Sequence, residues 1–143
     1  MRLGVLLAPL DNHAPSTGLA DQARALEAMG FASLWSAQAM GRGFMMTDPL
    51  IALATAAAVT ETLTLGTAVL QLPLYTPMEL AHRVFSLQQV CGDRLILVLV
   101  AGSTAADFAI AEKDYAQRFT NFQAHHQVAD QPASAIFRCG LAN

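Results

Sequence analysis

The 143-residue sequence predicts an α/β fold in which four strand–helix units follow one another and the strands are parallel. Three observations predict it: short apolar runs recur about every thirty residues, helix-start signals follow them, and the connections are short. Parallel strands joined by right-handed crossovers form either a doubly wound sheet or a barrel. The local pattern alone leaves both alternatives open.

Four apolar runs are the predicted strands. Each is apolar along nearly its whole length, which is typical of parallel strands that are buried on both faces. They cover residues 2–8, 32–36, 63–69 and 94–101.

Residues that can cap a helix precede the later predicted helices. Asp48 stands before Pro49, so an N-cap acceptor is followed by the residue best suited to the first helical position. Thr76 and Thr104 are each followed three residues later by an acidic residue, Glu79 and Asp107, which is the spacing of a capping box. The helices are predicted at residues 19–29, from 49, from 77 and at 105–111.

The composition narrows the class of protein and its partners. A net charge of −3 with eight scattered basic residues provides no basic patch for nucleic acid, and no apolar run reaches the ~18–20 residues that cross a bilayer. Cys91 and Cys139 are too few for a disulfide framework, and none of His82, His125 and His126 lies beside a second ligand at the spacing of a metal site. We therefore expect a cytoplasmic protein without a metal site, whose partner is a small molecule or another subunit.

The chain divides into two predicted regions. Residues 1–119 carry the strand–helix repeats, whereas residues 120–143 lack a sustained period. We expect the second region to be an irregular or partly helical tail. The first region is well short of the ~250 residues of a complete α/β barrel.

Four segments together resemble the luciferase-like monooxygenases, which depend on a flavin or a deazaflavin. They are LGVLL at residues 3–7, EAMGFASLW at 27–35, LGTAVL at 65–70, and DRLIL at 93–97 with AGS at 101–103. The resemblance covers residues 1–119 and implies a partial TIM-type barrel, the N-terminal half of the family's fold, with about four βα units. It also implies an oxidoreductase or monooxygenase that binds FMN or the deazaflavin F420 and acts on a small organic substrate.

In such a barrel the chemistry takes place at the mouth, where the loops after the strands converge. The resemblance places the cofactor against the ends of the third and fourth strands. The cofactor contacts that it implies are Thr67, Ala68, Val69, Gly102 and Ser103.

Other residues at the mouth are candidates for substrate binding and catalysis. Arg42, Phe44 and Tyr75 are the predicted substrate-side residues. Gln38 and His13, which follow the second and first strands, are the catalytic candidates. Because a glutamine has no proton to exchange near neutral pH, we expect Gln38 to act by hydrogen bonding rather than as a general base.

The sequence departs from the family's pattern in two places. Many members carry an acidic residue followed by histidine where Gln38 and Ala39 stand here. Glycines usual in the family's fourth strand are replaced by Val98 and Val100, which alternation places on one face. These departures support an alternative: a non-catalytic, truncated barrel remnant or oligomeric scaffold that binds flavin weakly or not at all.

A sheet of four parallel strands leaves two free edges and an apolar inner surface. We expect a homodimer in which strand one of one copy pairs with strand four of the other, so that eight strands close about a twofold axis. The other interpretation is a truncated product whose second half is lost, and the sequence does not separate the two.

Overall fold

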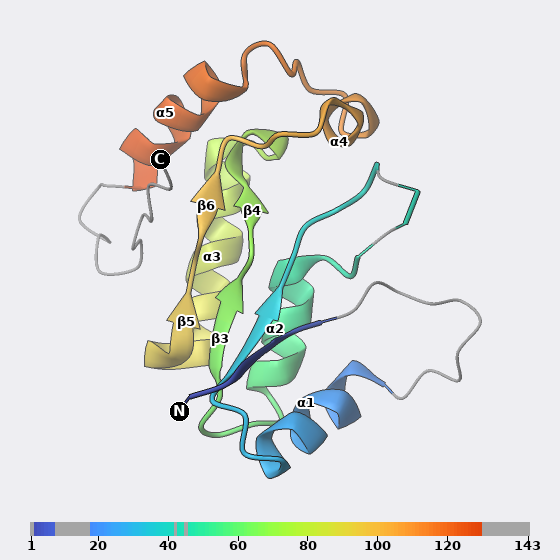
Figure 1. The fold of residues 1–143 in the computed structure, drawn as a ribbon. Helices are drawn as coiled ribbons and strands as arrows, with labels where there is room; N and C mark the ends of the chain where they lie inside the picture. The colour runs from blue at the N-terminus through green and yellow to red at the C-terminus, as the bar shows by residue number, and fades with distance from the viewer. Residues whose placement is uncertain (1, 8–17, 42, 45, 130–143) are drawn as a thin grey trace.

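The computed structural model describes residues 2–7, 18–41, 43–44 and 46–129, so the candidates His13 and Arg42 lie outside the described residues. The chain forms an open, parallel sheet in the order β1-β2-β3-β5 (Figure 1). Its strands are β1 (Gly4–Leu6), β2 (Ser33–Ser36), β3 (Thr64–Thr67) and β5 (Leu95–Ile96). Two further strands, β4 (Leu70–Gln71) and β6 (Leu99–Val100), pair in parallel and extend β3 and β5 (Figure 1).

Three helices lie on one face of this sheet (Figure 1). They are α1 (Leu19–Ala28), α2 (Pro49–Ala57) and α3 (Pro77–Cys91). The remaining helices are η1 (Leu72–Leu74), η2 (Gly92–Arg94), α4 (Ala105–Ile110) and α5 (Arg118–Ala129). The predicted alternation of parallel strands and helices is therefore confirmed.

The core lies between the sheet and the three helices. Leu34, Leu65 and Leu97, one from each of three neighbouring predicted strands, are fully buried there. Ala52 and Ala56 of α2 are also fully buried, and their small side chains let the helix approach the sheet closely. Each fully buried leucine stabilises the fold by about 1.5–3 kcal/mol relative to an exposed one, so this layer is a principal source of stability.

One of the three predicted helix caps is present. The Asp48 carboxylate accepts hydrogen bonds from the backbone of Leu50 and Ile51 at 2.9 and 3.1 Å, as an N-cap does. Thr76 makes no side-chain cap, and the capping-box prediction there is wrong. Glu79 instead accepts from Arg83 one turn along the helix, at 2.6 Å, because a charged guanidinium four residues away is available to it.

The third and fourth predicted strands are each interrupted. The hydroxyl of Thr67 accepts from the Val98 N–H at 2.8 Å and donates to the Val98 carbonyl at 3.1 Å. A side chain thus takes the place that backbone groups of the neighbouring strand would occupy in a regular ladder. The peptide bond between Ala68 and Val69 is cis and lies between β3 and β4. On the fourth strand Leu97 is fully buried and Val98 half-buried, as alternation predicts.

The predicted tail begins with a helix that packs on the rest of the chain. Phe122 of α5 packs against the core, and His125 is buried. The His125 ring lies between two carbonyl oxygens, with Nδ1 2.6 Å from that of Asn121 and Nε2 2.9 Å from that of Tyr75. These contacts hold α5 against the segment that leads into α3.

A carboxylate from α1 organises the turn that precedes β3. Glu27 accepts backbone hydrogen bonds from Glu61, Thr62 and Leu63, and one from the Thr62 hydroxyl. These bonds, with the Thr62 N–H first among them, lower the pKa of Glu27, because hydrogen bonds to a carboxylate favour its charged form. A single side chain thus ties the end of the first unit to the start of the third strand.

The face of the sheet opposite the three helices, which we call the inner face, carries Trp35. Its indole lies over two glycines of neighbouring strands, and its Nε1 donates to Ser33 at 2.9 Å. A Cβ at Gly66 would lie 2.3 Å from the ring, and one at Gly4 would lie 2.9 Å from Nε1. Leu6, opposite Trp35 in the strand register, is 54% exposed, so this face is open.

We predict that Gly66→Ala lowers the free energy of unfolding by about 1–3 kcal/mol, because the added methyl overlaps the Trp35 ring. Urea unfolding followed by the fluorescence of the single tryptophan measures the change. Asp93→Glu, which adds one methylene group to an exposed side chain, is the control. If both variants lose the same free energy of unfolding, the loss in Gly66→Ala does not come from overlap with the Trp35 ring.

Candidate functional site

Polar side chains from several segments gather where the strands end at their carboxyl edge. The loop after β2, the start of α2, the end of β4, the residue after η1 and the short helix α4 each contribute one of them (Figure 1). We call this group the mouth cluster, and it consists of Gln38, Asp48, Gln71, Tyr75 and Asp107.

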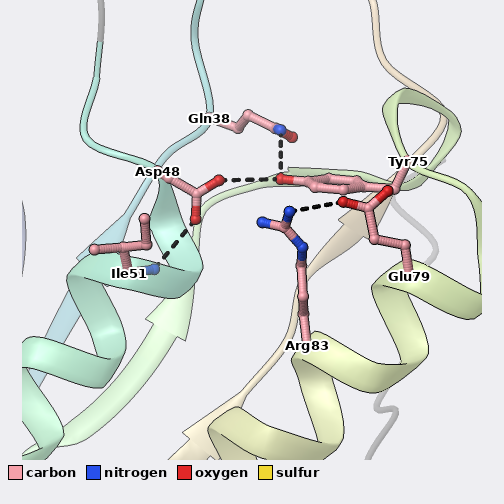
Figure 2. Close-up of polar contacts among 6 residues, drawn as sticks. All are labelled: Gln38, Asp48, Ile51, Tyr75, Glu79 and Arg83. Carbon is pink, nitrogen blue, oxygen red and sulfur yellow. Dashed lines mark hydrogen bonds and ion pairs between the residues drawn. The ribbon is translucent and has the colours of Figure 1, made fainter.

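Tyr75 is hydrogen-bonded on both sides by members of the cluster. The side-chain amide of Gln38 donates to the phenol oxygen at 2.8 Å, and the phenol donates to Asp48 at 3.4 Å (Figure 2). The other carboxylate oxygen of Asp48 caps α2, so the N-cap and the mouth share one side chain. Arg83 lies near the ring, with its guanidinium carbon 6.0 Å from the ring centroid (Figure 2).

Burial raises the pKa of the Tyr75 phenol above its ordinary value of 10.0, and the negative charge of Asp48 raises it further. The positive charge of Arg83 opposes the shift but does not cancel it. The phenol therefore keeps its proton at neutral pH and serves as a hydrogen-bond donor to the carboxylate.

Gln38 is 9% exposed, and both ends of its amide are engaged. Its oxygen accepts from the backbone N–H of Gln71 at 2.9 Å, while its nitrogen donates to Tyr75. Its own backbone N–H donates to the carbonyl of Val69 at 3.2 Å. This geometry agrees with a role in holding the mouth together by hydrogen bonds rather than in proton exchange.

Asp107, like Asp48 and Gln71, is a member of the mouth cluster that the sequence did not indicate as a site residue. Its predicted capping pair with Thr104 is wrong, because its carboxylate points into the fold and Thr104 makes no side-chain cap. One oxygen accepts from the backbone of Met40 and Gly41 at 3.2 and 2.8 Å, and the other accepts from Gln71 at 3.0 Å. The signal available in the sequence was a single acidic residue in an otherwise apolar short helix, AADFAI, and the structure shows that residue to be fully buried.

The predicted cofactor contacts lie on two neighbouring strands, Thr67, Ala68 and Val69 between β3 and β4 or at the end of β3, and Gly102 and Ser103 after β6. Ala68 and Val69 are half-buried, whereas Thr67 is fully buried and bonded to Val98. Gly102 has a φ of +89°, which favours glycine. Ser103 is exposed, and its carbonyl accepts from Tyr115 at 3.1 Å.

Of the predicted substrate-side residues, Tyr75 lies within the mouth cluster and Phe44 is 45% exposed on the loop after β2. Within residues 2–7, 18–41, 43–44 and 46–129, no three His, Cys, Asp or Glu side chains converge as metal ligands. None of the helices in the same ranges is both long and apolar enough for a membrane span.

We predict that Tyr75→Phe lowers the free energy of unfolding at neutral pH by about 1–2 kcal/mol, because it leaves the Gln38 amide without an acceptor. A folded-state pKa above the unfolded value of 10.0 means that protonation of Tyr75 stabilises the fold below pH 10.0. That contribution is lost as the pH rises above 10.0 toward the folded-state value.

The measurement is the free energy of unfolding of both proteins at several pH values between about 8 and 11, with tyrosinate absorbance recorded in parallel. The difference between wild type and Tyr75→Phe isolates the contribution of this phenol. If the difference in the free energy of unfolding instead grows as the pH rises above 10.0, Tyr75 does not have a raised pKa, and its placement in a buried site beside Asp48 is contradicted.

Comparison with known proteins places this geometry in a family. Residues 1–128 match the model of the luciferase-like monooxygenases. The 4-hydroxyprotoasukamycin monooxygenase of Streptomyces nodosus subsp. asukaensis is 32% identical over 110 residues, which are 73% of this chain and 30% of that protein. The chain therefore spans less than a third of the length of this relative.

Solved structures share the fold at low identity. The oxygenating constituent of 3,6-diketocamphane monooxygenase from Pseudomonas putida, in complex with FMN, has a TM-score of 0.78 at 16% identity, over 92% of this chain and 40% of that one. An F420-dependent secondary alcohol dehydrogenase in complex with an F420–acetone adduct has a TM-score of 0.69 at 19% identity, over 89% and 40%. The open sheet thus corresponds to part of a TIM-type barrel, and the chain belongs to the luciferase-like monooxygenase family.

Proposed function

We propose that this chain supplies one half of the cofactor site of a flavin- or deazaflavin-dependent oxidoreductase or monooxygenase that acts on a small organic substrate. The observation that carries the proposal is the position of Ala68 and Val69. They are half-exposed beside the mouth cluster, at the carboxyl edge of a sheet whose fold is shared with enzymes solved with FMN and with F420. In α/β barrels that edge is where cofactors and substrates bind.

The side chains at this edge fit a flat aromatic ring system. Ala68 and Val69 are small or branched, apolar and only half-buried, so they offer a surface without charge. When bound, FMN or F420 supplies the transfer of electrons or hydride that no side chain of the cluster can perform. The protein's part is to bind and orient the ring and the substrate.

The polar residues of the mouth supply hydrogen bonds rather than acid–base chemistry in this proposal. Tyr75 is protonated at neutral pH, and its raised pKa keeps it protonated into the alkaline range, while Gln38 has no proton to exchange. Together they hold the loop after β2 beside the strand ends. Substrate-side contacts are expected from this loop, including the exposed Phe44.

We predict that absorbance titration with FMN and, separately, F420 perturbs the bands of one of them with micromolar affinity. Ala68→Leu is expected to weaken that binding at least about tenfold, or ~1.4 kcal/mol, because the larger side chain occupies the surface proposed for the ring. Ala28→Leu, at the exposed end of α1, is the matched control and leaves the affinity within about twofold. Circular dichroism verifies that both variants fold.

A second candidate is a non-catalytic scaffold that keeps the fold. It is favoured by the engagement of both ends of the Gln38 amide within the protein and by the valines at positions 98 and 100. Absence of binding by both cofactors supports this alternative and removes the first proposal for the isolated chain.

We further propose that a second copy of the chain covers the open inner face. Within the described residues, β1 pairs only with β2 and β5 only with β3, so each outer strand has one free edge. The two edges run in the same direction and can pair in parallel across a twofold axis. Leu3, just before β1, and Leu6, at its end, are 51% and 54% exposed. Burying these apolar side chains against a second copy would remove them from water.

We predict a dimer of twice the chain mass, 15.2 kDa, in light scattering coupled to size-exclusion chromatography. Leu6→Lys is expected to shift the equilibrium to monomer, because it places a charge on the surface to be buried. Ile110→Lys, also at an exposed apolar residue but on α4, is the control. A monodisperse monomer of the wild-type chain contradicts the proposal and leaves further strands of a longer polypeptide as the cover.

A further inference from the structure

Asp107 is a buried carboxylate that joins three segments of the mouth. It lies on α4, and its oxygens accept from the backbone of Met40 and Gly41 and from the side chain of Gln71. Its exposed fraction is 0%, so these bonds form away from competing water. A carboxylate that accepts several N–H groups is well satisfied in such a place, whereas an unsatisfied one is costly.

The same residue is the first link of a hydrogen-bond chain across the mouth. Asp107 accepts from the Gln71 side chain, the Gln71 backbone donates to Gln38, and Gln38 donates to Tyr75, which donates to Asp48. This series of hydrogen bonds begins at Asp107 on α4 and ends at Asp48, the cap of α2. It therefore connects α4, which follows the fourth predicted strand, to the start of α2.

Two glycines, Gly41 and Gly102, lie where the segments of the mouth pack so closely that a Cβ atom would not fit. A Cβ at Gly41 would lie 2.6 Å from the backbone of Ala106, so the loop after β2 lies directly on α4. A Cβ at Gly102 would lie 2.5 Å from the amide oxygen of Gln71. Because Asp107 accepts from the Gln71 nitrogen, it also determines that the oxygen faces Gly102.

We propose that Asp107 is a positioning residue that holds the loop of residues 37–41 on α4 and thereby sets the place of Gln38 at the cofactor site. Its effect on the loop follows from the contacts above. Its effect on cofactor binding rests on the function proposed for the mouth.

The test measures amide hydrogen exchange in Asp107→Ala. The variant removes the acceptor of the Met40 and Gly41 N–H groups and of the Gln71 amide, so exchange at Met40 and Gly41 is expected to accelerate at least about tenfold, with the core amides unchanged. Asp114→Ala is the matched control, since Asp114 is exposed and its carboxylate accepts from the backbone N–H of Ala116, between α4 and α5. Unchanged exchange at Met40 and Gly41, or equal acceleration throughout the core, overturns the proposal.

A conservative variant provides the rescue. In Asp107→Asn one side-chain oxygen still accepts from Met40 and Gly41, and a turn of the Gln71 amide presents its oxygen, which has no hydrogen-bond partner among the described residues, to the asparagine nitrogen. Protection at Met40 and Gly41 is expected to return to within about threefold of the wild type. If Asp107→Ala does not fold, an Asp107→Asn protein with these two amides protected supports the assignment, and one without that protection overturns it.

Cofactor titration of the same proteins separates this inference from the proposed function. Binding of FMN or F420 is expected to weaken at least about tenfold in Asp107→Ala, to recover in Asp107→Asn, and to stay within about twofold in Asp114→Ala. Wild-type protein that binds neither cofactor refutes the proposed function, while the exchange experiment still decides the role of Asp107 in the loop.

Discussion

The burial of one face of the parallel sheet against α2 and its neighbours is the constraint on which the rest of the structure depends. Leu34, Leu65 and Leu97 enter this layer from successive strands, and the alanines of α2 bring the helix close to them. Side chains alternate along a strand. When these leucines are buried under the helices, the residues next to them in each strand therefore point to the inner face. The same packing keeps the strands parallel, so that all of their carboxyl ends meet at one edge.

That edge has to accommodate polar backbone and side-chain groups in a largely apolar protein. The interruptions after Thr67 and at Val98 remove regular strand pairing, and side chains supply the missing hydrogen bonds. The mouth cluster extends this pattern, because each of its members bonds to another member or to backbone. Hydrogen bonds thus satisfy the polar groups of this edge, while apolar residues such as Val69 stay only half-buried there.

Much of the architecture was predictable because it depends on local chemistry. Apolar runs located the strands, and Asp48 before Pro49 located the start of α2 with its cap. Local patterns were misleading where a distant partner offered a stronger bond. Asp107 has the spacing of a capping residue, yet it accepts from Gly41 and Gln71, which are far from it along the chain.

The sequence by itself therefore determined the order of strands and helices, their parallel arrangement and the residues that stand at the strand ends, since periodicity and caps are properties of neighbours along the chain. Only the tertiary structure decided which of those residues meet. It joined Gln38 to Tyr75 and Gln71, turned Asp107 inward, and placed Trp35 over Gly66. Those contacts bring together segments that are distant along the chain, and the pairing of a buried polar group is decided by whichever partner the fold brings within reach.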